Sequence, residues 1–444
     1  MEASLQQILD AREKRVQKQR SLIKQFQKPL VCFTMNIPGP EKYNRDVSIG
    51  FFVGCKLLEN ALHGKKILHR EIHREITGCE GYYIVDMSAI ALKQLTVSIE
   101  DTDSIGRLFD MDVLDADGQK LSRETLNLPK RTCLLCNADA VVCARSRRHP
   151  LEQLQEKTGF LLYLAARQYL CEYIAVQGYF ALQQEVSTTP KPGLVDRNNH
   201  GSHKDMNMRH FFASANALRP YLCSFAETGF LTRDLSPEET FSKIRKIGKD
   251  AEKAMIKATH GVNTHKGAIF SLGILCAAAG RLPPDCWQPE QLLAVCAAMT
   301  KGLTLRDFAG ITPDAAQTAG ERLYALHGIA GVRGQAESGF PAVESVGLPI
   351  LHQGLNKGLS FNDAGCITLL YLISEVDDTN LIHRSRLEKQ LSIRSELKAL
   401  LAQTPFPTMD TIIELDKRFI AENLSPGGCA DLLALTYFLY FLQA

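Results

Sequence analysis

The sequence predicts two domains: an N-terminal α+β half with a mostly antiparallel sheet, and a C-terminal half that is all-α. Three observations support this fold class. The chain has 444 residues, which is more than one domain usually holds. Short apolar runs of strand length occur before residue 150, and long segments with helical spacing of apolar residues follow it. We therefore expect one domain over residues 1–155 and a second over residues 158–444.

The segment from Leu5 to Phe26 predicts a basic amphipathic helix, because its apolar residues recur at roughly helical spacing. It contains no uninterrupted apolar stretch, so it does not resemble a signal peptide. A helix with a solvated basic face is the favoured interpretation. A helix that binds a membrane surface is the alternative.

Strands are expected at residues 29–35, 81–87, 95–99 and 108–113, where apolar residues form short runs or alternate with polar ones. Residues 115–118 read DADG, which is typical of a turn. Two strands followed by a turn indicate part of an antiparallel sheet.

The second half begins with a long helical pattern at residues 151–184, and few of its segments resemble strands. Catalytic groups of such a domain would lie on the loops between helices. Further helices are expected at residues 209–226, 237–258, 268–279, 290–302, 314–326, 362–374, 384–402 and 430–442.

Composition argues against several classes of protein. The net charge is +2 and neither half carries a strong positive excess, which argues against a nucleic-acid partner. The 13 cysteines are odd in number and scattered over a long chain, which is typical of the reducing cytosol. The longest apolar runs, 267–280 and 430–442, are shorter than the roughly 20 residues that span a bilayer. We therefore expect a cytoplasmic protein with no membrane partner.

Asp110 and Asp112 form the first candidate site. A strand points residues i and i+2 to one face, so the two carboxylates would lie together, opposite the apolar residues. Mg²⁺ suits such a pair, since it binds carboxylates together with substrate phosphates. Glu100 would offer a third carboxylate and Arg107 a phosphate contact. The alternative is a surface strand with solvated acids.

Cys133, Cys136, Cys143 and His149 form the second candidate site, with the spacing C-x2-C-x6-C-x5-H. Two thiolates on one tight turn, completed by a later cysteine and histidine, could hold a structural Zn²⁺. The alternative is a set of free thiols with a surface histidine.

Five polar loops of the second half form the third candidate site, at residues 185–206, 261–267, 331–341, 377–380 and 425–431. Four of them combine Gly or Pro with charged or histidine side chains, and the fifth, DDTN, is an acidic patch near a helix end. Together they indicate a phosphate-rich ligand and a metal. Each loop alone also fits an ordinary turn or helix cap. The candidates, in chain order, are Lys191, Asp196, His203, Asp205, His265, Lys266, Arg333, Asp378, Asn380, Gly427 and Gly428.

The first half resembles the phosphoribosyl-dephospho-CoA transferase that modifies the acyl carrier subunit of citrate lyase. The resemblance rests on the segments PGP, GRLFDMDVL and LSR, and on the cysteine segment Arg131–His149. It implies a nucleotidyltransferase-like fold.

The second half resembles triphosphoribosyl-dephospho-CoA synthase. That resemblance rests on PKPGLVD with the following G-x-H-x-D-M, on NTHKG, on RGQAESGFP, on DDTN and on SPGG-x-ADLLA. One departure stands out: the family usually has Glu where this chain has Gln335. A glutamine cannot act as a base or a charged metal ligand. We expect this residue to make only a secondary contact.

The resemblance implies two reactions. The second half would join ribose C1 of ATP to the 2′-hydroxyl of 3′-dephospho-CoA and release adenine. The first half would transfer phosphoribosyl-dephospho-CoA to a serine of the apo acyl carrier subunit of citrate lyase and release pyrophosphate. A malonate decarboxylase-type carrier is one alternative recipient. A non-catalytic adaptor that binds carrier and CoA is a second alternative.

The residues present fit these reactions. Asp196 or Asp205 would activate the 2′-hydroxyl or bind Mg²⁺, and His265 would assist the departure of adenine. Lys191, Lys266 and Arg333 would hold the triphosphate. In the first half, Asp110 and Asp112 would hold Mg²⁺ on the triphosphate while the carrier serine attacks.

Overall fold

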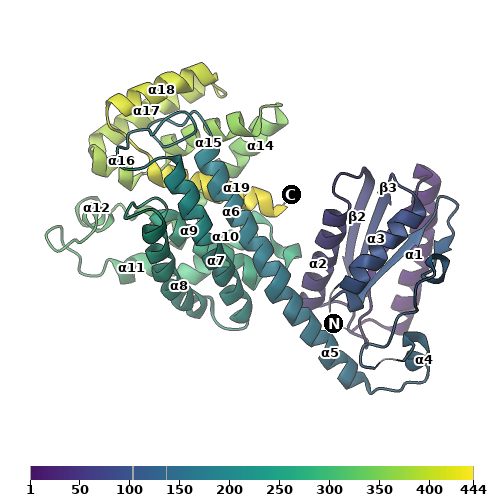
Figure 1. Ribbon diagram of the computed structural model, residues 1–444. Helices are drawn as coiled ribbons and strands as arrows, with labels where there is room; N and C mark the ends of the chain where they lie inside the picture. Colours follow the sequence, from purple (N-terminus) through teal and green to yellow (C-terminus); the bar gives the residue numbers. More distant parts are fainter. Residues whose placement is uncertain (1, 103–104, 137, 444) are drawn as a thin grey trace. The chain divides into compact units, whose positions relative to one another are not determined.

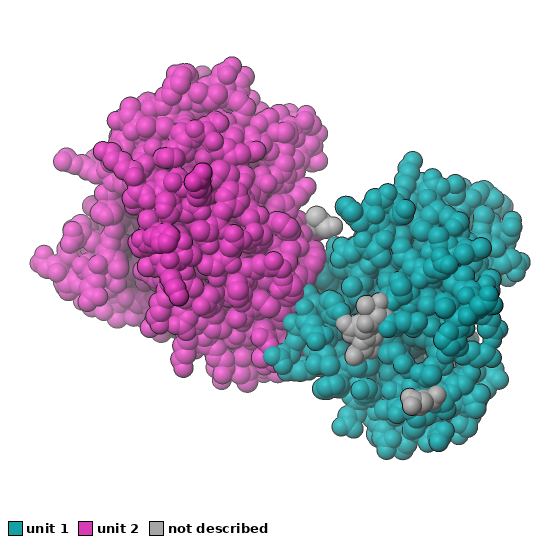
Figure 2. All heavy atoms as spheres, viewed as in Figure 1, with its two compact units in different colours: residues 1–170, 283–285 teal, residues 171–282, 286–444 magenta. Residues whose placement is uncertain are grey.

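The structure is a computed structural model that describes residues 2–102, 105–136 and 138–443. The chain divides into two compact units, coloured separately in Figure 2. Unit 1 comprises residues 1–170 and 283–285, and unit 2 comprises residues 171–282 and 286–444.

Unit 1 contains a five-stranded sheet in which every pairing of neighbouring strands is antiparallel, as the sequence predicted. The strand order is β2-β3-β1-β4-β5. The strands are β1 (Leu30–Met35), β2 (Ile67–Glu75), β3 (Gly78–Val85), β4 (Phe109–Leu114) and β5 (Lys120–Leu121). Strand β1 lies in the centre of the sheet, and β3 and β4 pair with it on either side.

Helices cover both faces of this sheet (Figure 1). Helix α1 (Leu5–Phe26) packs Leu22 and Ile23 against one face, which confirms the predicted N-terminal helix. Helices α2 (Arg45–Ala61) and α3 (Ala89–Thr102) cover the other face and enclose the main core of the unit.

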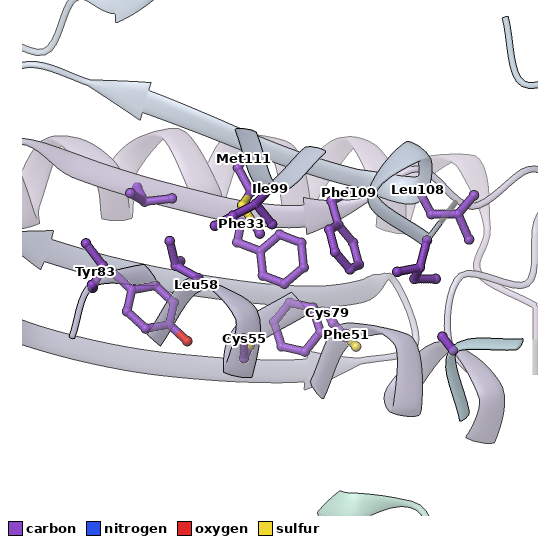
Figure 3. Close-up of a cluster of buried hydrophobic side chains, with 14 of the residues drawn as sticks. Phe33, Phe51, Cys55, Leu58, Cys79, Tyr83, Ile99, Leu108, Phe109 and Met111 are labelled. Atoms are coloured by element: carbon purple, nitrogen blue, oxygen red, sulfur yellow. The ribbon is translucent and has the colours of Figure 1, made fainter. Parts of the chain in front are cut away.

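The main core of unit 1 is built from aromatic and aliphatic side chains of α2, α3 and the strands (Figure 3). The ring of Phe33 on β1 stacks on Phe51 of α2 at 4.8 Å between centroids and meets Phe109 of β4 edge-on at 5.3 Å. Such contacts add to the free energy gained by burying these rings. These ring contacts hold β4 in position against β1 and connect both strands to α2.

The expected strand at residues 95–99 is wrong, because these residues lie within α3. Its β-branched residues favour a strand, but the buried positions Leu92, Thr96 and Ile99 recur every three or four residues along a helix. Strand β2 was not predicted from the sequence; most of its residues are half-exposed, and six of the nine are charged or histidine. Such a strand at the sheet edge has little apolar alternation to reveal it.

Unit 2 is helical, and the structure contains no strand among the residues it describes there. The long predicted helix comprises α5 (Leu151–Ala165) and one π turn (Ala166–Leu170), which belong to unit 1, and α6 (Cys171–Ser187), which belongs to unit 2. The remaining helices are the short α4 (Ala140–Arg145) of unit 1, then α7 (Met208–Leu231), α8 (Pro237–Ala258), α9 (Lys266–Arg281), α10 (Pro289–Thr300), α11 (Leu303–Asp307), α12 (Ala319–His327), α13 (Gly331–Glu337), α14 (Leu348–Asn356), α15 (Phe361–Glu375), α16 (Thr379–Arg384), α17 (Leu387–Gln403), α18 (Met409–Ala421) and α19 (Gly427–Gln443).

Helices α9 and α19 form the centre of unit 2, and nearly every residue of α9 is buried. Glycines let α9 and α7 approach backbone to backbone: a Cβ at Gly229 would overlap the Ala277 carbonyl, and one at Gly280 would overlap that of Ala226. Although α9 and α19 are apolar, no helix among the described residues is both long and apolar enough to cross a membrane.

The segment GVRGQAESGFP was expected to be a loop, but its first seven residues form helix α13. The glycines that suggested a loop sit at its start and middle, where helix contacts with α10 and α11 override their low helix propensity. The expected loop 185–206 begins slightly later, since α6 continues to Ser187.

Candidate active sites

All five predicted loops of the second half contribute to one cavity of about 1070 Å³ in unit 2. Its walls come from the α6–α7 loop, the start of α9, helix α13, the α15–α16 junction and the start of α19. Loops that are far apart in the sequence are thereby brought together by the helices. The cavity lies wholly within unit 2.

Asp196 organises the α6–α7 loop rather than facing the cavity. One carboxylate oxygen accepts the Thr189 hydroxyl (2.7 Å) and the Lys191 N–H (3.0 Å), and the other accepts the N–H groups of Asn198 (2.7 Å) and Asn199 (3.0 Å). These four hydrogen bonds use both oxygens of a residue that is 3% exposed. Asp196 is not part of the cavity lining.

Lys191 lies in the lining but is paired internally. Its side chain is 1% exposed, its Nζ donates to the Glu185 carbonyl at 2.8 Å, and it forms an ion pair with the Glu185 carboxylate. Burial raises the pKa of Glu185, and the Lys191 ammonium opposes that rise. The charge of Lys191 is therefore compensated before any ligand binds.

His203 links two of the converging loops. Its Nδ1 accepts from Arg384 (3.0 Å) and its Nε2 donates to the Ser425 hydroxyl (2.9 Å), so both ring nitrogens are engaged. Burial lowers the pKa of His203 to about 4, and the Arg384 guanidinium adds to this effect. Asp205 lies 4.0 Å from His203, with its side chain 66% exposed, and is not part of the lining.

His265 lies directly before α9 and lines the cavity. Its Nδ1 lies 2.7 Å from the Ser214 hydroxyl, and its ring meets Phe211 edge-on. Burial lowers the pKa of His265 to about 3, with the Lys191 charge acting in the same direction. The imidazole is therefore neutral at neutral pH and cannot deliver a proton as an imidazolium.

Two cations reach the cavity from more exposed positions. Lys266 is 57% exposed and pairs with Glu252 at 2.5 Å. Arg333 is 31% exposed, its Nε donates to Asp307 at 2.9 Å, and its guanidinium lies over the Phe308 ring. Both positive charges are therefore more accessible to solvent than the buried Lys191 ammonium.

The DDTN and SPGG segments form one wall. Asp378 caps α16 through the N–H groups of Asn380 and Leu381, and its other oxygen accepts the Cys429 N–H at 2.8 Å. Gly427 and Gly428 permit this approach, since a Cβ would lie 2.8 Å from the Asn380 amide nitrogen and 3.1 Å from the Asp378 carboxylate, respectively. All four predicted residues therefore meet here.

Glu185 and Asp431 line the same cavity, and the sequence analysis did not select either. Asp431 lies over the start of α9, where Gly267 leaves room for its carboxylate and the Ala268 N–H donates to it. Burial, with Glu185 and Asp378 nearby, raises the pKa of Asp431 well above its usual range. Its position in the SPGGCAD motif was the available signal.

In unit 1, Asp110 and Asp112 lie on the same face of β4, because buried and half-buried residues alternate along this strand. Asp112 pairs with Lys120 of β5 at 2.5 Å. Burial raises the pKa of Asp110, and the neighbouring Asp112 charge adds to the rise. An additional cation would relieve this crowding of two carboxylates.

Glu100 and Arg107 hold the backbone together around this strand. Glu100 is on α3, where it accepts the Met111 N–H (2.9 Å) and pairs with Arg123 (2.9 Å). Arg107 donates to the carbonyls of Thr132 (2.7 Å) and Cys133 (2.9 Å). Glu100 was expected to bind a metal and Arg107 a phosphate. In the described structure both side chains already have protein partners.

The four predicted zinc ligands come together. The ligand atoms of Cys133, Cys136, Cys143 and His149 all lie within 4.8 Å of one another, and no other such group of three or more occurs among the described residues. The Cys136 sulfur is 4.0 Å from that of Cys143 and 3.3 Å from His149 Nε2. By the same measure, Asp110, Asp112 and Glu100 do not form a closed set of three ligands.

The chain thus has one cavity in a helical unit and one carboxylate pair on a sheet, an arrangement that fits a two-part enzyme acting on phosphorylated substrates. Residues 171–444 match the family described as ATP:dephospho-CoA triphosphoribosyl transferase. Residues 3–162 match the family described as apo-citrate lyase phosphoribosyl-dephospho-CoA transferase. The chain belongs to the family in which these two transferases are fused.

Three relatives support this assignment. The chain is 39% identical to the CitXG protein of Haemophilus influenzae, over 98% of this chain and 95% of the relative. It is 33% identical to the CitXG protein of Leuconostoc mesenteroides, over 98% and 96%. It is 39% identical to a 2-(5″-triphosphoribosyl)-3′-dephosphocoenzyme-A synthase of Haemophilus ducreyi, over 68% and 98%. The chain is a bifunctional transferase that makes the citrate lyase prosthetic group and attaches it.

Proposed function

We propose that the two reactions occur at the two sites described above. The cavity of unit 2 would take ATP and 3′-dephospho-CoA, join ribose C1 to the 2′-hydroxyl and release adenine. The observation that carries this assignment is the convergence of all five loops on one cavity within the residues matched by the triphosphoribosyl transferase family. We also propose that residues 158–444 catalyse this first reaction and that residues 1–155 catalyse the transfer to the carrier.

The test is incubation of the full chain with ATP, 3′-dephospho-CoA and Mg²⁺, with mass spectrometry for free adenine and the joined product. We expect both, in equal amounts. Joined product formed without adenine would contradict the proposed displacement. Adenine formed without joined product would show that water, rather than the 2′-hydroxyl, is the acceptor.

We propose that the Asp110–Asp112 face of β4 serves the second reaction, on a nucleotidyltransferase-like fold. A half-buried carboxylate pair with a raised pKa on Asp110 fits Mg²⁺, provided that substrate phosphates complete the coordination. Bound Mg²⁺ would neutralise phosphate charge. Asp110 and Asp112 would orient the triphosphate so that the carrier serine attacks the α-phosphate and pyrophosphate leaves.

The recipient is proposed to be the apo acyl carrier subunit of citrate lyase, and the compartment the cytoplasm. Separate offers of this carrier and of a malonate decarboxylase-type carrier, each with the joined product, test the recipient. Labelling of the citrate lyase carrier alone supports the proposal. Equal or preferential labelling of the other carrier contradicts it.

We propose that the cysteine–histidine cluster holds a structural Zn²⁺. With Zn–S bonds of about 2.3 Å, two sulfurs of a tetrahedral site lie roughly 3.8 Å apart, close to the 4.0 Å between Cys136 and Cys143. The Leu135 N–H points at the Cys133 sulfur at 3.5 Å, as a thiolate ligand favours. The set of donors and their spacing therefore fit zinc.

Such a zinc would stabilise the start of β4. Arg107 binds the carbonyls of Thr132 and Cys133, and Arg131 binds those of Phe109 (2.7 Å) and Arg107 (3.0 Å) in return. These reciprocal contacts join the segment that carries the cysteine–histidine cluster to β4, the strand that carries Asp110. The metal thus supports the carboxylate pair without touching it.

Metal analysis of the purified chain tests the zinc proposal. We expect about one zinc per chain, lost in Cys136→Ser and kept in the control Cys223→Ser, whose half-buried thiol belongs to unit 2 and is not one of the grouped ligands. Zinc retained by Cys136→Ser, or a folded wild-type chain purified without zinc, would contradict it.

A further inference from the structure

The loop that leads into α9 and the first turns of this helix contain three buried polar atoms without a hydrogen-bond partner among the described residues. They are the Thr264 hydroxyl, the Nε2 of His265 and the Ser271 hydroxyl. All three residues line the cavity, and His265 and Ser271 are 3% and 0% exposed. Buried polar groups are nearly always hydrogen-bonded, so this cluster indicates that a ligand supplies the missing partners.

The hydrogen-bonding groups of these three residues are uncharged. His265 is neutral, the other two groups are hydroxyls, and the nearby Lys191 is already compensated by Glu185. The ring of Phe211, which packs edge-on against His265, adds an aromatic wall to the same part of the cavity. Neutral donors and acceptors beside an aromatic ring suit a flat heteroaromatic base better than a polyphosphate.

The start of α9 is not free to bind an anion. Asp431 already accepts the Ala268 N–H, so its carboxyl group occupies the helix start that was expected to cradle a phosphate. Glu185 and Asp378 lie close enough to Asp431 to raise its pKa. The more exposed Lys266 and Arg333 are therefore better placed for phosphate groups.

We propose that Thr264, His265, Ser271 and Asp431 form a subsite for the adenine of ATP, in which Asp431 is the acid that protonates the leaving base. This inference rests on the proposed function, since it assigns the nucleobase end of that reaction's substrate. It also assigns an orientation to ATP, with the base in the buried part of the cavity and the triphosphate towards Lys266 and Arg333.

The chemistry balances with one carboxyl group. The C1–N9 bond of ATP breaks with its electron pair passing to adenine, whose ring takes the Asp431 proton. The 2′-hydroxyl oxygen of dephospho-CoA forms the new bond to C1, and the proton that it loses restores Asp431 to its acid form. A carboxylic acid in this position supplies what the neutral His265 cannot, because glycosyl transfer needs a protonated leaving group.

Binding of two separate probes, adenine and inorganic tripolyphosphate, to the full chain tests the subsite. We expect Ser271→Ala to weaken adenine binding about 3- to 10-fold, as loss of one hydrogen bond would, and to leave tripolyphosphate binding unchanged. Arg333→Ala should do the reverse. Ser374→Ala is the matched control, because Ser374 is equally buried but bonds to the Tyr371 carbonyl outside the cavity lining.

Thr264→Val provides a second variant at a half-exposed residue should Ser271→Ala disturb the packing of α9. It should also weaken adenine binding alone. If either variant weakens tripolyphosphate binding and spares adenine, the start of α9 is a phosphate site and the proposal is overturned. Adenine binding that neither variant alters overturns it as well.

Turnover of Asp431→Asn tests the acid. We expect adenine release to slow by roughly 10²- to 10⁴-fold, the usual contribution of a general acid, with a much smaller change in the KM for ATP. A tenfold or smaller change in kcat would overturn the assignment of Asp431. If instead the wild-type chain releases no adenine, the proposed function fails, while adenine binding still decides whether the subsite exists.

Discussion

Replacement of Lys191 by methionine should destabilise unit 2 strongly, because it leaves the Glu185 carboxylate without its counter-charge. The two side chains are 1% and 6% exposed, and the lysine also donates to the Glu185 carbonyl at 2.8 Å. Breaking a buried ion pair of this kind costs about 3–5 kcal/mol. Replacing both partners, as in Lys191→Met with Glu185→Leu, should recover most of that loss, since no unpaired charge then remains.

The chain offers a direct assay. Its single tryptophan, Trp287, is 4% exposed in unit 2, so its fluorescence reports the unfolding of that unit in urea. The free energy of unfolding is compared for the wild type, both single variants and the double variant. The control is Lys398→Met, which removes a pair with Glu375 that is about half exposed at 2.8 Å and should cost less than about 1 kcal/mol.

The loss should also depend on pH. Burial already raises the pKa of Glu185, and without the Lys191 charge nothing opposes that rise. A carboxyl group whose pKa is higher in the folded state contributes stability at low pH that is lost as pH rises through the folded-state pKa. The Lys191→Met chain should therefore lose less stability at pH 5 than at pH 8. A cost below 1 kcal/mol, or one that grows towards pH 5, would refute this reasoning.

Three further predictions concern single residues. Gly193→Ala should destabilise unit 2 by about 1–3 kcal/mol, because φ is +70° there and a Cβ would overlap the Leu424 carbonyl; an unchanged urea midpoint would contradict it. Asp112→Asn should abolish carrier labelling while adenine release continues, and loss of both activities would show that the two sites are not independent. Gln335→Glu should leave adenine release within a few-fold of the wild type; a gain of tenfold or more would mean that the family's carboxylate is missed.

Much of the architecture follows from apolar periodicity. The alternation at residues 108–113 gave β4 and the common face of its aspartates, and helical spacing gave α8 with both of its ends. The strand expected at 95–99 failed because its β-branched residues lie on a helix whose burial is decided by the sheet beneath it. Local sequence cannot report that tertiary choice.

The candidate sites were only partly predictable for a similar reason. Sequence motifs located the cysteine cluster and the five loops that meet in the cavity. They did not reveal that Glu100 would bind the Met111 N–H or that Arg107 would bind the carbonyls of the cysteine loop. A charged residue in a motif predicts that its side chain makes a specific interaction. Only the fold decides whether the partner in that interaction is a ligand or the backbone.

Asp196 and Asp431 show how that decision is made. Both are aspartates in glycine-containing motifs, yet Asp196 accepts four hydrogen bonds from its own loop while Asp431 is held by one backbone N–H and lines the cavity. The four donors engage both carboxylate oxygens of Asp196 within its own loop, and the residue is not part of the cavity lining. A carboxyl group with few donors and acidic neighbours keeps its proton and can give it away. The count of donors around each oxygen, which only the structure supplies, therefore separates the aspartate that builds the loop from the one proposed to act on the leaving base.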